Sequence, residues 1–134
     1  EQVKLRYFEQ DLHWENEEKT PIQIVSDCYP SLTIKEVRKN LACCGIMGEH
    51  AMQAIGTLSG GEQAKVKICL LILTPCNFII MDEPTNHLDI QAKQSLKIAL
   101  KEFKGTVLLV SHEPDFYKEW VQKIISIENI IKKR

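Results

Sequence analysis

The sequence predicts an α/β fold in which a mostly parallel sheet carries an inserted helical unit. Segments typical of strands and of helices alternate along most of the 134 residues, a length that fits one domain. Two consecutive helix starts interrupt this alternation between residues 20 and 56, which we interpret as a small all-helical insertion. Acidic and histidine side chains directly follow two apolar runs, as expected at the carboxyl ends of parallel strands, where ligands bind.

Four segments have the character of strands. Residues 3–8 alternate apolar and polar side chains, which indicates a half-buried strand. Residues 77–82 form a short apolar run, and residues 106–110 are β-branched and apolar, as in buried parallel strands. Residues 124–127 are expected to form a further strand.

Capping residues mark where the helices begin. Thr20, Thr33 and Ser59 are each followed three residues later by Gln or Glu, and each therefore predicts a capping box. Gly45 and Gly48 are expected to end the second of these helices, and Pro75 the third. Two more helices are expected: one with an apolar face at Leu96, Ala99, Leu100 and Phe103 that ends at Gly105, and one from Pro114 to about Trp120.

The composition argues against several classes of function. The net charge of -1 provides no field that favours direct binding to DNA or to an anionic membrane. The longest apolar run, residues 68–73, is far too short to span a bilayer, so no membrane domain is visible. The five cysteines contain no CxxC pair, which suggests neither a zinc site nor a disulfide framework and fits a reducing cytoplasm.

Asp82 and Glu83 come at the end of an apolar run. One carboxylate there can hold Mg²⁺, which prefers oxygen ligands, and the other can orient or deprotonate a water for phosphoryl transfer. For an isolated Asp-Glu pair, two ordinary turn acids would be the better interpretation. The sequence PTNHLD at residues 84–89 follows directly and favours the functional one.

Ser59, Gly60, Gly61 and Glu62 open a helix, where unpaired N–H groups and the helix dipole attract anions. The glycines allow the backbone to approach a ligand closely. Ser59 can offer its hydroxyl to a phosphate, or it can simply cap the helix with Glu62 as its partner. The two interpretations are compatible.

His112 and Gln10 each follow a predicted strand. The imidazole of His112 can hydrogen-bond a terminal phosphate, but a surface or capping histidine fits the residue equally well. The amide of Gln10 can bind Mg²⁺ or water, although a solvated loop glutamine is the favoured interpretation when the residue is taken alone.

Taken together, three stretches resemble the ABC ATPase family: LSGGEQ at 58–63, IIMDEPTNHLD at 79–89 and LLVSHEPDF at 108–116. The resemblance covers essentially the whole chain and implies part of a P-loop NTPase core. In the family's terms the chain is one partial nucleotide-binding domain, made of a Q-loop strand (1–11), a helical subdomain (12–57) and a core with the signature helix, Walker B strand, D-loop and H-loop (58–134).

The same resemblance implies ATP and Mg²⁺ as ligands and assigns roles to the candidate residues. Glu83 would be the catalytic glutamate and His112 the histidine that stabilises the transferred phosphate. Asp82 and Gln10 would hold Mg²⁺. The residues that would contact nucleotide, or signal its presence, are Gln10, Ser59, Gly60, Gly61, Glu62 and Asp89.

The pairing of LSGGEQ with DEPTNHLD, in place of LSGGQ with DEPTSALD, resembles the ABC-F group. Those proteins carry two nucleotide-binding domains in one chain and act on the ribosome, in translation or in antibiotic protection. Residues 102–112 resemble the second of the two domains. The expected partners are therefore a second nucleotide-binding domain in the same chain and the ribosome. The alternative is the ATPase subunit of an ABC transporter.

The sequence contains no GxxxxGK[ST] motif. The family's phosphate-binding loop, Walker A, is therefore expected upstream of Glu1 in a longer protein. By itself the chain is expected to bind ATP weakly or not at all, and to be inactive.

Overall fold

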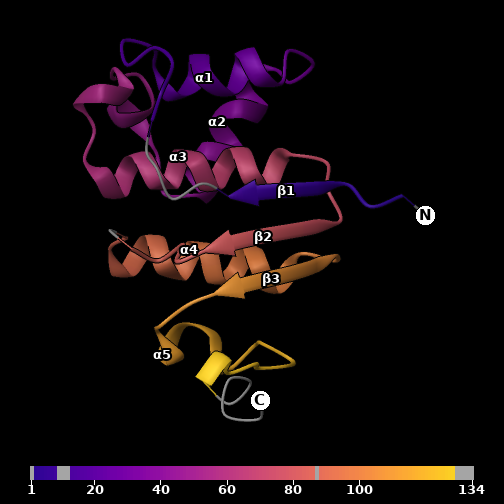
Figure 1. The fold of residues 1–134 in the computed structure, drawn as a ribbon. Helices are drawn as coiled ribbons and strands as arrows, with labels where there is room; N and C mark the ends of the chain where they lie inside the picture. Colours follow the sequence, from indigo (N-terminus) through magenta and orange to yellow (C-terminus); the bar gives the residue numbers. More distant parts are fainter. Residues whose placement is uncertain (1, 9–12, 87, 129–134) are drawn as a thin grey trace.

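The computed structural model describes residues 2–8, 13–86 and 88–128. At its centre is a parallel sheet with the strand order β1 (Leu5–Phe8), β2 (Phe78–Asp82) and β3 (Thr106–Val110) (Figure 1). The predicted α/β architecture with a parallel sheet is confirmed. All three strands end at the same edge, and helices α3 (Gly60–Leu73) and α4 (Ile90–Glu102) begin on that side (Figure 1).

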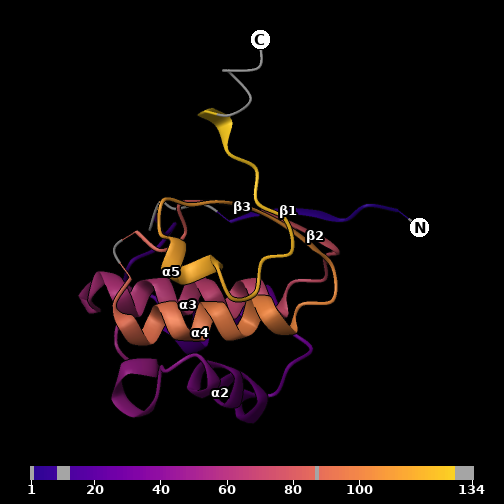
Figure 2. The same cartoon turned by 90° about the horizontal axis from the view of Figure 1, so that it is seen from below.

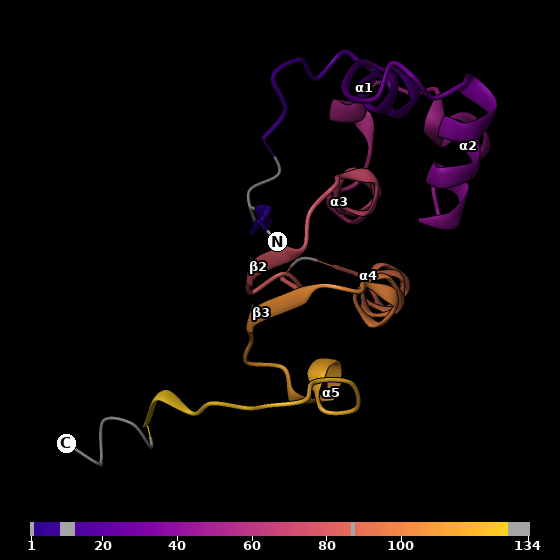
Figure 3. The same ribbon diagram turned by 90° about the vertical axis from the view of Figure 1, so that its right-hand side faces the viewer.

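The two faces of the sheet are different. Helices α3 and α4 cover one face, where Ile79 and Met81 of β2 are buried (Figure 3). On the other face Tyr7 pairs in register with Ile80, which pairs with Leu108. Tyr7 and Leu108 are about half exposed, so the described part of the chain leaves this face without a helical layer.

The predicted helical unit consists of α1 (Pro21–Cys28), α2 (Ile34–Cys43) and two 3₁₀ turns, η1 (Gly48–Ala51) and η2 (Ile55–Thr57). Helix α3 lies between this unit and the sheet (Figures 2 and 3). None of the helices in the described ranges is long and apolar enough to cross a membrane.

The capping predictions for α1 and α2 are confirmed. The hydroxyl oxygens of Thr20 and Thr33 each accept a hydrogen bond from the backbone N–H three residues later, and the Gln or Glu at that position accepts one in return. At the end of α2, Gly45 has φ +91, a conformation that costs glycine little. This allows the N–H of Ile46 to reach the carbonyl of Leu41 at 2.9 Å, which closes the helix.

The expected strand at residues 124–127 is wrong. Residues 121–126 form no strand, and Ile124 and Ile125 are each 61% exposed. After the short helix α5 (Pro114–Tyr117), which ends before the expected Trp120, the chain runs away from the sheet (Figure 3). An apolar run forms a strand only where a neighbouring strand takes up its backbone hydrogen bonds, and this segment has no such neighbour in the described structure.

The junction between α4 and β3 depends on a glycine. A Cβ atom at Gly105 would lie 2.3 Å from the carbonyl oxygen of Asn77 and 2.6 Å from a ring carbon of Phe103. The same carbonyl accepts the N–H of Thr106 at 2.9 Å, which aligns β3 with β2.

We therefore expect Gly105→Ala to lower the free energy of unfolding by about 2 kcal/mol or more, because the added methyl group must displace backbone. Guanidinium unfolding followed by circular dichroism measures the change. Lys104→Ala, at the exposed neighbouring position, is the control and should change stability by less than about 0.5 kcal/mol. Equal stability of the two variants would contradict the packing at this junction.

Candidate functional site

Glu83 and His112 meet where β2 and β3 end. The backbone N–H of Glu83 donates to the carbonyl of Val110 at 2.8 Å, which places the residue after β2 beside the end of β3. From there Oε1 of Glu83 lies 3.0 Å from Nε2 of His112. The Glu83 side chain is 17% exposed and that of His112 is 91% exposed. A largely buried carboxylate is thus paired with an imidazole that is open to solvent.

The backbone of Glu83 is strained. Its φ of +46 lies in the left-handed region, which residues with a side chain rarely adopt. Its carbonyl accepts the N–H of Asn86 at 3.2 Å, so the strain belongs to the tight turn that follows β2. Such conformations cost about 1 kcal/mol or more and cluster at functional sites. Here the strained turn directs the carboxylate toward His112.

Asp82 is the last residue of β2 and is exposed. Proteins usually bind Mg²⁺ through only one or two carboxylates, while nucleotide phosphates and water supply the other ligands. A single exposed carboxylate at this position fits that pattern. Gln10, the other predicted Mg²⁺ ligand, lies outside the described residues.

Ser59 and Glu62 form a capping box at the N-terminus of α3. The Ser59 hydroxyl accepts the N–H of Glu62 at 3.2 Å, and Glu62 Oε2 accepts the N–H of Ser59 at 3.0 Å. This second hydrogen bond is the main reason that the pKa of Glu62 lies below its usual value. His50 Nδ1 lies 2.5 Å from the other carboxylate oxygen. The capping role predicted for Ser59 is confirmed.

Asp89 joins the start of α4 to the start of α3. Its Oδ1 accepts the N–H of Ala92 at 2.7 Å and so caps α4. Its Oδ2 would lie 3.2 Å from a Cβ atom at Gly61, so a side chain there would crowd the carboxylate. The same oxygen lies 3.9 Å from the amine of Lys65, whose side chain is only 6% exposed. The structure therefore brings Gly61 and Asp89 together.

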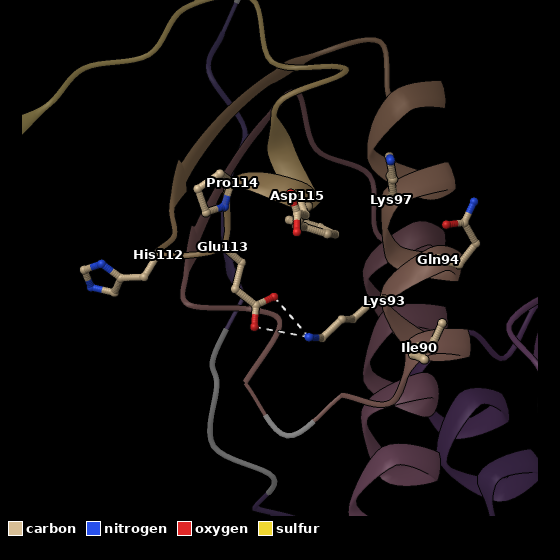
Figure 4. A pocket seen from close by; sticks show the side chains of 9 residues that line it. Ile90, Lys93, Gln94, Lys97, His112, Glu113, Pro114 and Asp115 are labelled. Carbon is tan, nitrogen blue, oxygen red and sulfur yellow. Dashed lines mark hydrogen bonds and ion pairs between the residues drawn. The ribbon is translucent and has the colours of Figure 1, made fainter.

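A groove of about 520 Å³ lies between α4 and α5 (Figure 4). At its wall the Lys93 amine and the Glu113 carboxylate are 3.1 Å apart, and this contact lowers the pKa of Glu113. In a second pair, the amine of Lys97 on α4 lies 2.8 Å from the carboxylate of Glu119, which follows α5. His112 lines the groove, but its ring points away from Lys93 (Figure 4). The two ion pairs therefore join α4 to the residues on either side of α5.

Two residues near the predicted site were missed by sequence reasoning. Lys65 is only 5% exposed although it is charged, and Trp14 is 8% exposed within an otherwise exposed acidic stretch. The sequence did contain signs of both. Lys65 is a charged residue on a largely apolar helix, and Trp14 is a single aromatic residue among acidic ones. Neither signal says which element the side chain packs against.

The chain is similar in sequence to a known protein family and to several known proteins. A family model described as ABC transporter matches residues 1–86. A Bacillus subtilis (strain 168) protein, "Uncharacterized ABC transporter ATP-binding protein YfmM", is 49% identical over 119 residues, which is 89% of this chain and 23% of that protein. "ABC transporter F family member 2" of Arabidopsis thaliana is 35% identical over 124 residues, which is 92% of this chain and 18% of that protein. The chain thus spans about a fifth of these relatives.

The fold is also that of solved structures. A dimeric post-hydrolysis state of the ATP-binding cassette MJ0796 bound to ADP and Pi matches with a TM-score of 0.68 and 23% identity. The match covers 85% of this chain and 54% of that one. At this identity the likeness establishes the fold, and the α/β topology of ABC ATPase domains is confirmed.

The capping box at Ser59 predicts a pH effect. Because the folded pKa of Glu62 is lowered, its contribution to stability is full above the ordinary glutamate value of about 4.3 and is lost as pH falls through the folded pKa. Glu62→Gln should keep the hydrogen bond, as Gln23 does for Thr20 at 2.9 Å, but lose this dependence. The free energy of unfolding should therefore fall less between about pH 6 and pH 3 in the variant than in the wild type.

Denaturant unfolding at both pH values measures the effect. Glu18→Gln, an exposed glutamate outside any capping box, is the control and should follow the wild type. If Glu62→Gln loses as much stability as the wild type over this range, the charge of Glu62 does not support the helix.

Proposed function

The chain belongs to the ABC transporter family, and we propose that the whole protein binds and hydrolyses ATP. The observation that supports this best is the pair formed by Glu83 and His112, 3.0 Å apart, at the carboxyl ends of β2 and β3. This is the edge at which parallel α/β sheets bind their ligands. An acid–imidazole pair there can supply a base for an attacking water and a hydrogen-bond donor for a phosphate oxygen.

In the proposed reaction Glu83 orients a water and takes its proton. The water oxygen bonds to the γ-phosphorus as the bond from that phosphorus to the ADP oxygen breaks. Once turned from Glu83 toward the nucleotide, His112 donates a hydrogen bond to a γ-phosphate oxygen and stabilises the developing charge. Asp82 and Gln10 would hold a Mg²⁺ ion, which would supply neutralisation of the phosphate charge.

The N-terminus of α3 would serve a second ATP. Ser59, Gly60 and Gly61 offer a hydroxyl and free N–H groups to the γ-phosphate bound on a second nucleotide-binding domain, with Glu62 holding Ser59 in place. Asp89 lies beside Gly61 and follows the turn that holds Glu83. It would therefore connect the phosphate contact at Gly61 with the end of β2. We also propose that the chain divides into a Q-loop strand (1–11), a helical subdomain (12–57) and a core (58–134).

We further propose that the protein is of the ABC-F type and acts on the ribosome, in translation or antibiotic protection, from the cytoplasm. The sequence DEPTNHLD and the similarity to an F family member support this. The second candidate is the ATPase subunit of a transporter. It is favoured by the match to the ABC transporter family and by the similarity to a Bacillus subtilis protein named as an ABC transporter ATP-binding protein.

In the full-length protein, Glu83→Gln should keep ATP binding but lower the turnover number by about 100-fold or more, because an amide cannot accept the proton of water. Steady-state phosphate release and nucleotide binding measure the two effects separately. Glu102→Gln, at an exposed position at the end of α4, is the matched control. Unchanged turnover in Glu83→Gln would refute its assignment as the catalytic glutamate.

Co-sedimentation separates the two candidate functions. With a slowly hydrolysed ATP analogue, the full-length protein should pellet with ribosomes. It should do so much less with ADP, because ADP lacks the γ-phosphate that the second nucleotide-binding domain is proposed to contact. Ribosomes with bovine serum albumin serve as the control for trapping. No nucleotide-dependent binding would favour the transporter alternative.

A further inference from the structure

Trp14 joins the segment that follows β1 to the side of α3. Its indole ring is 8% exposed, and its N–H donates to Oε1 of Gln63 at 2.9 Å. The amine of Lys67 lies 4.3 Å from the centroid of the same ring and 3.3 Å from the carbonyl oxygen of His13. Gln63 and Lys67 are four residues apart on α3 and so lie on one face of the helix.

The side-chain amide of Gln63 connects Trp14 to Leu58. While its oxygen accepts the indole N–H, its nitrogen donates to the carbonyl of Leu58 at 3.0 Å. A flipped amide would turn its N–H groups toward the indole N–H and its oxygen toward the carbonyl, and both hydrogen bonds would be lost. Trp14 therefore selects the amide orientation that holds Leu58, the residue directly before Ser59.

The same two segments are joined again nearby. The N–H groups of Ile55 and Gly56 donate to the carbonyls of Lys19 and Glu17, at 2.8 and 3.0 Å. A Cβ atom at Gly56 would lie 3.0 Å from that of Glu17, so the backbones approach closely. Residues 13–19 thus run beside the chain that leads into the 58–63 segment.

We infer that Trp14 is a positioning residue for the N-terminus of α3, acting on Ser59 through Gln63 and Leu58. This role rests on the proposed ATPase function. Trp14 does not touch the proposed phosphate-binding atoms, and its effect is to fix how the loop before α3 presents Ser59 and the N–H groups that follow. Loss of the contact lowers the fraction of molecules in which this end of α3 is correctly placed, so it lowers the turnover number more than the affinity for ATP.

Two substitutions in the full-length protein break the connection at different points. Trp14→Phe keeps a ring but removes the indole N–H. Gln63→Glu keeps an acceptor for the indole N–H but removes the donor to Leu58. Each should lower kcat for ATP about three- to tenfold, the usual worth of one hydrogen bond, with KM changed less than about twofold. The double variant should be no slower than the slower single one, because both break one chain of contacts.

Trp120→Phe is the matched control. The Trp120 indole also donates a hydrogen bond, but to the carbonyl of Phe116 on α5, away from α3. The variant should leave kcat within about twofold of the wild type. Thermal unfolding of every variant is measured alongside, and Gln63→Glu, at a half-buried position, keeps the test available if Trp14→Phe yields little folded protein.

The outcomes separate the inference from the function on which it rests. If the wild type hydrolyses ATP but neither Trp14→Phe nor Gln63→Glu slows kcat more than Trp120→Phe does, the inference is wrong. It is also wrong if the two effects multiply in the double variant, since Trp14 and Gln63 would then act independently. A full-length wild type without ATP turnover would overturn the proposed function and, with it, this role of Trp14.

Discussion

The burial of α3 on two sides is the constraint on which the rest of the structure depends. A helix that is apolar around most of its circumference must be enclosed, and α3 lies between the helical unit and the sheet, with α4 beside it. Val66 and Ile68 are fully buried on it, as are Val37 and Leu41 of α2. The direction in which α3 points is therefore fixed by both neighbours.

Two buried side chains of α3, Lys65 and Cys69, make polar contacts that also fix the position of the helix. The amine of Lys65 reaches Gln91 at 3.3 Å and lies 3.9 Å from Asp89, so it joins α3 to the start of α4. On another side the thiols of Cys69 and Cys44 are hydrogen-bonded, and that contact, with burial, raises the pKa of Cys69. Cys69 remains a protonated, small core residue, as its apolar surroundings in the sequence indicate. Polar and apolar contacts thus hold α3 from two directions.

The N-terminus of α3 is the part of this enclosed helix where contacts from several other segments meet. The N-terminus of α3 is where Ser59 and Glu62 cap the helix, where Asp89 approaches Gly61, and where Gln63 meets both Trp14 and Leu58. These contacts come from the segment after β1, from the loop before α4 and from the helix itself. Any ligand bound at this end would therefore act on all three.

The local features were predictable from sequence because they depend on residues close together in the chain. A Thr or Ser with Gln or Glu three residues later is sufficient for a capping box, and all three predicted boxes are present at α1, α2 and α3. The short apolar runs that became β2 and β3 also placed Glu83 and His112 at neighbouring strand ends, since parallel strands end at one edge. The family motifs gave those residues their proposed roles.

The long-range contacts were decided only by the tertiary structure. The apolar run at residues 124–127 has the composition of a strand, yet whether it pairs depends on where the chain goes after α5. Similarly, nothing in the sequence around Trp14 identifies Gln63, 49 residues away, as the acceptor of its N–H, or places the amine of Lys65 beside Asp89. Sequence determined which groups are available at the ends of strands and helices. Packing decided which of them meet, because a partner distant in the chain is selected by the geometry of the whole core.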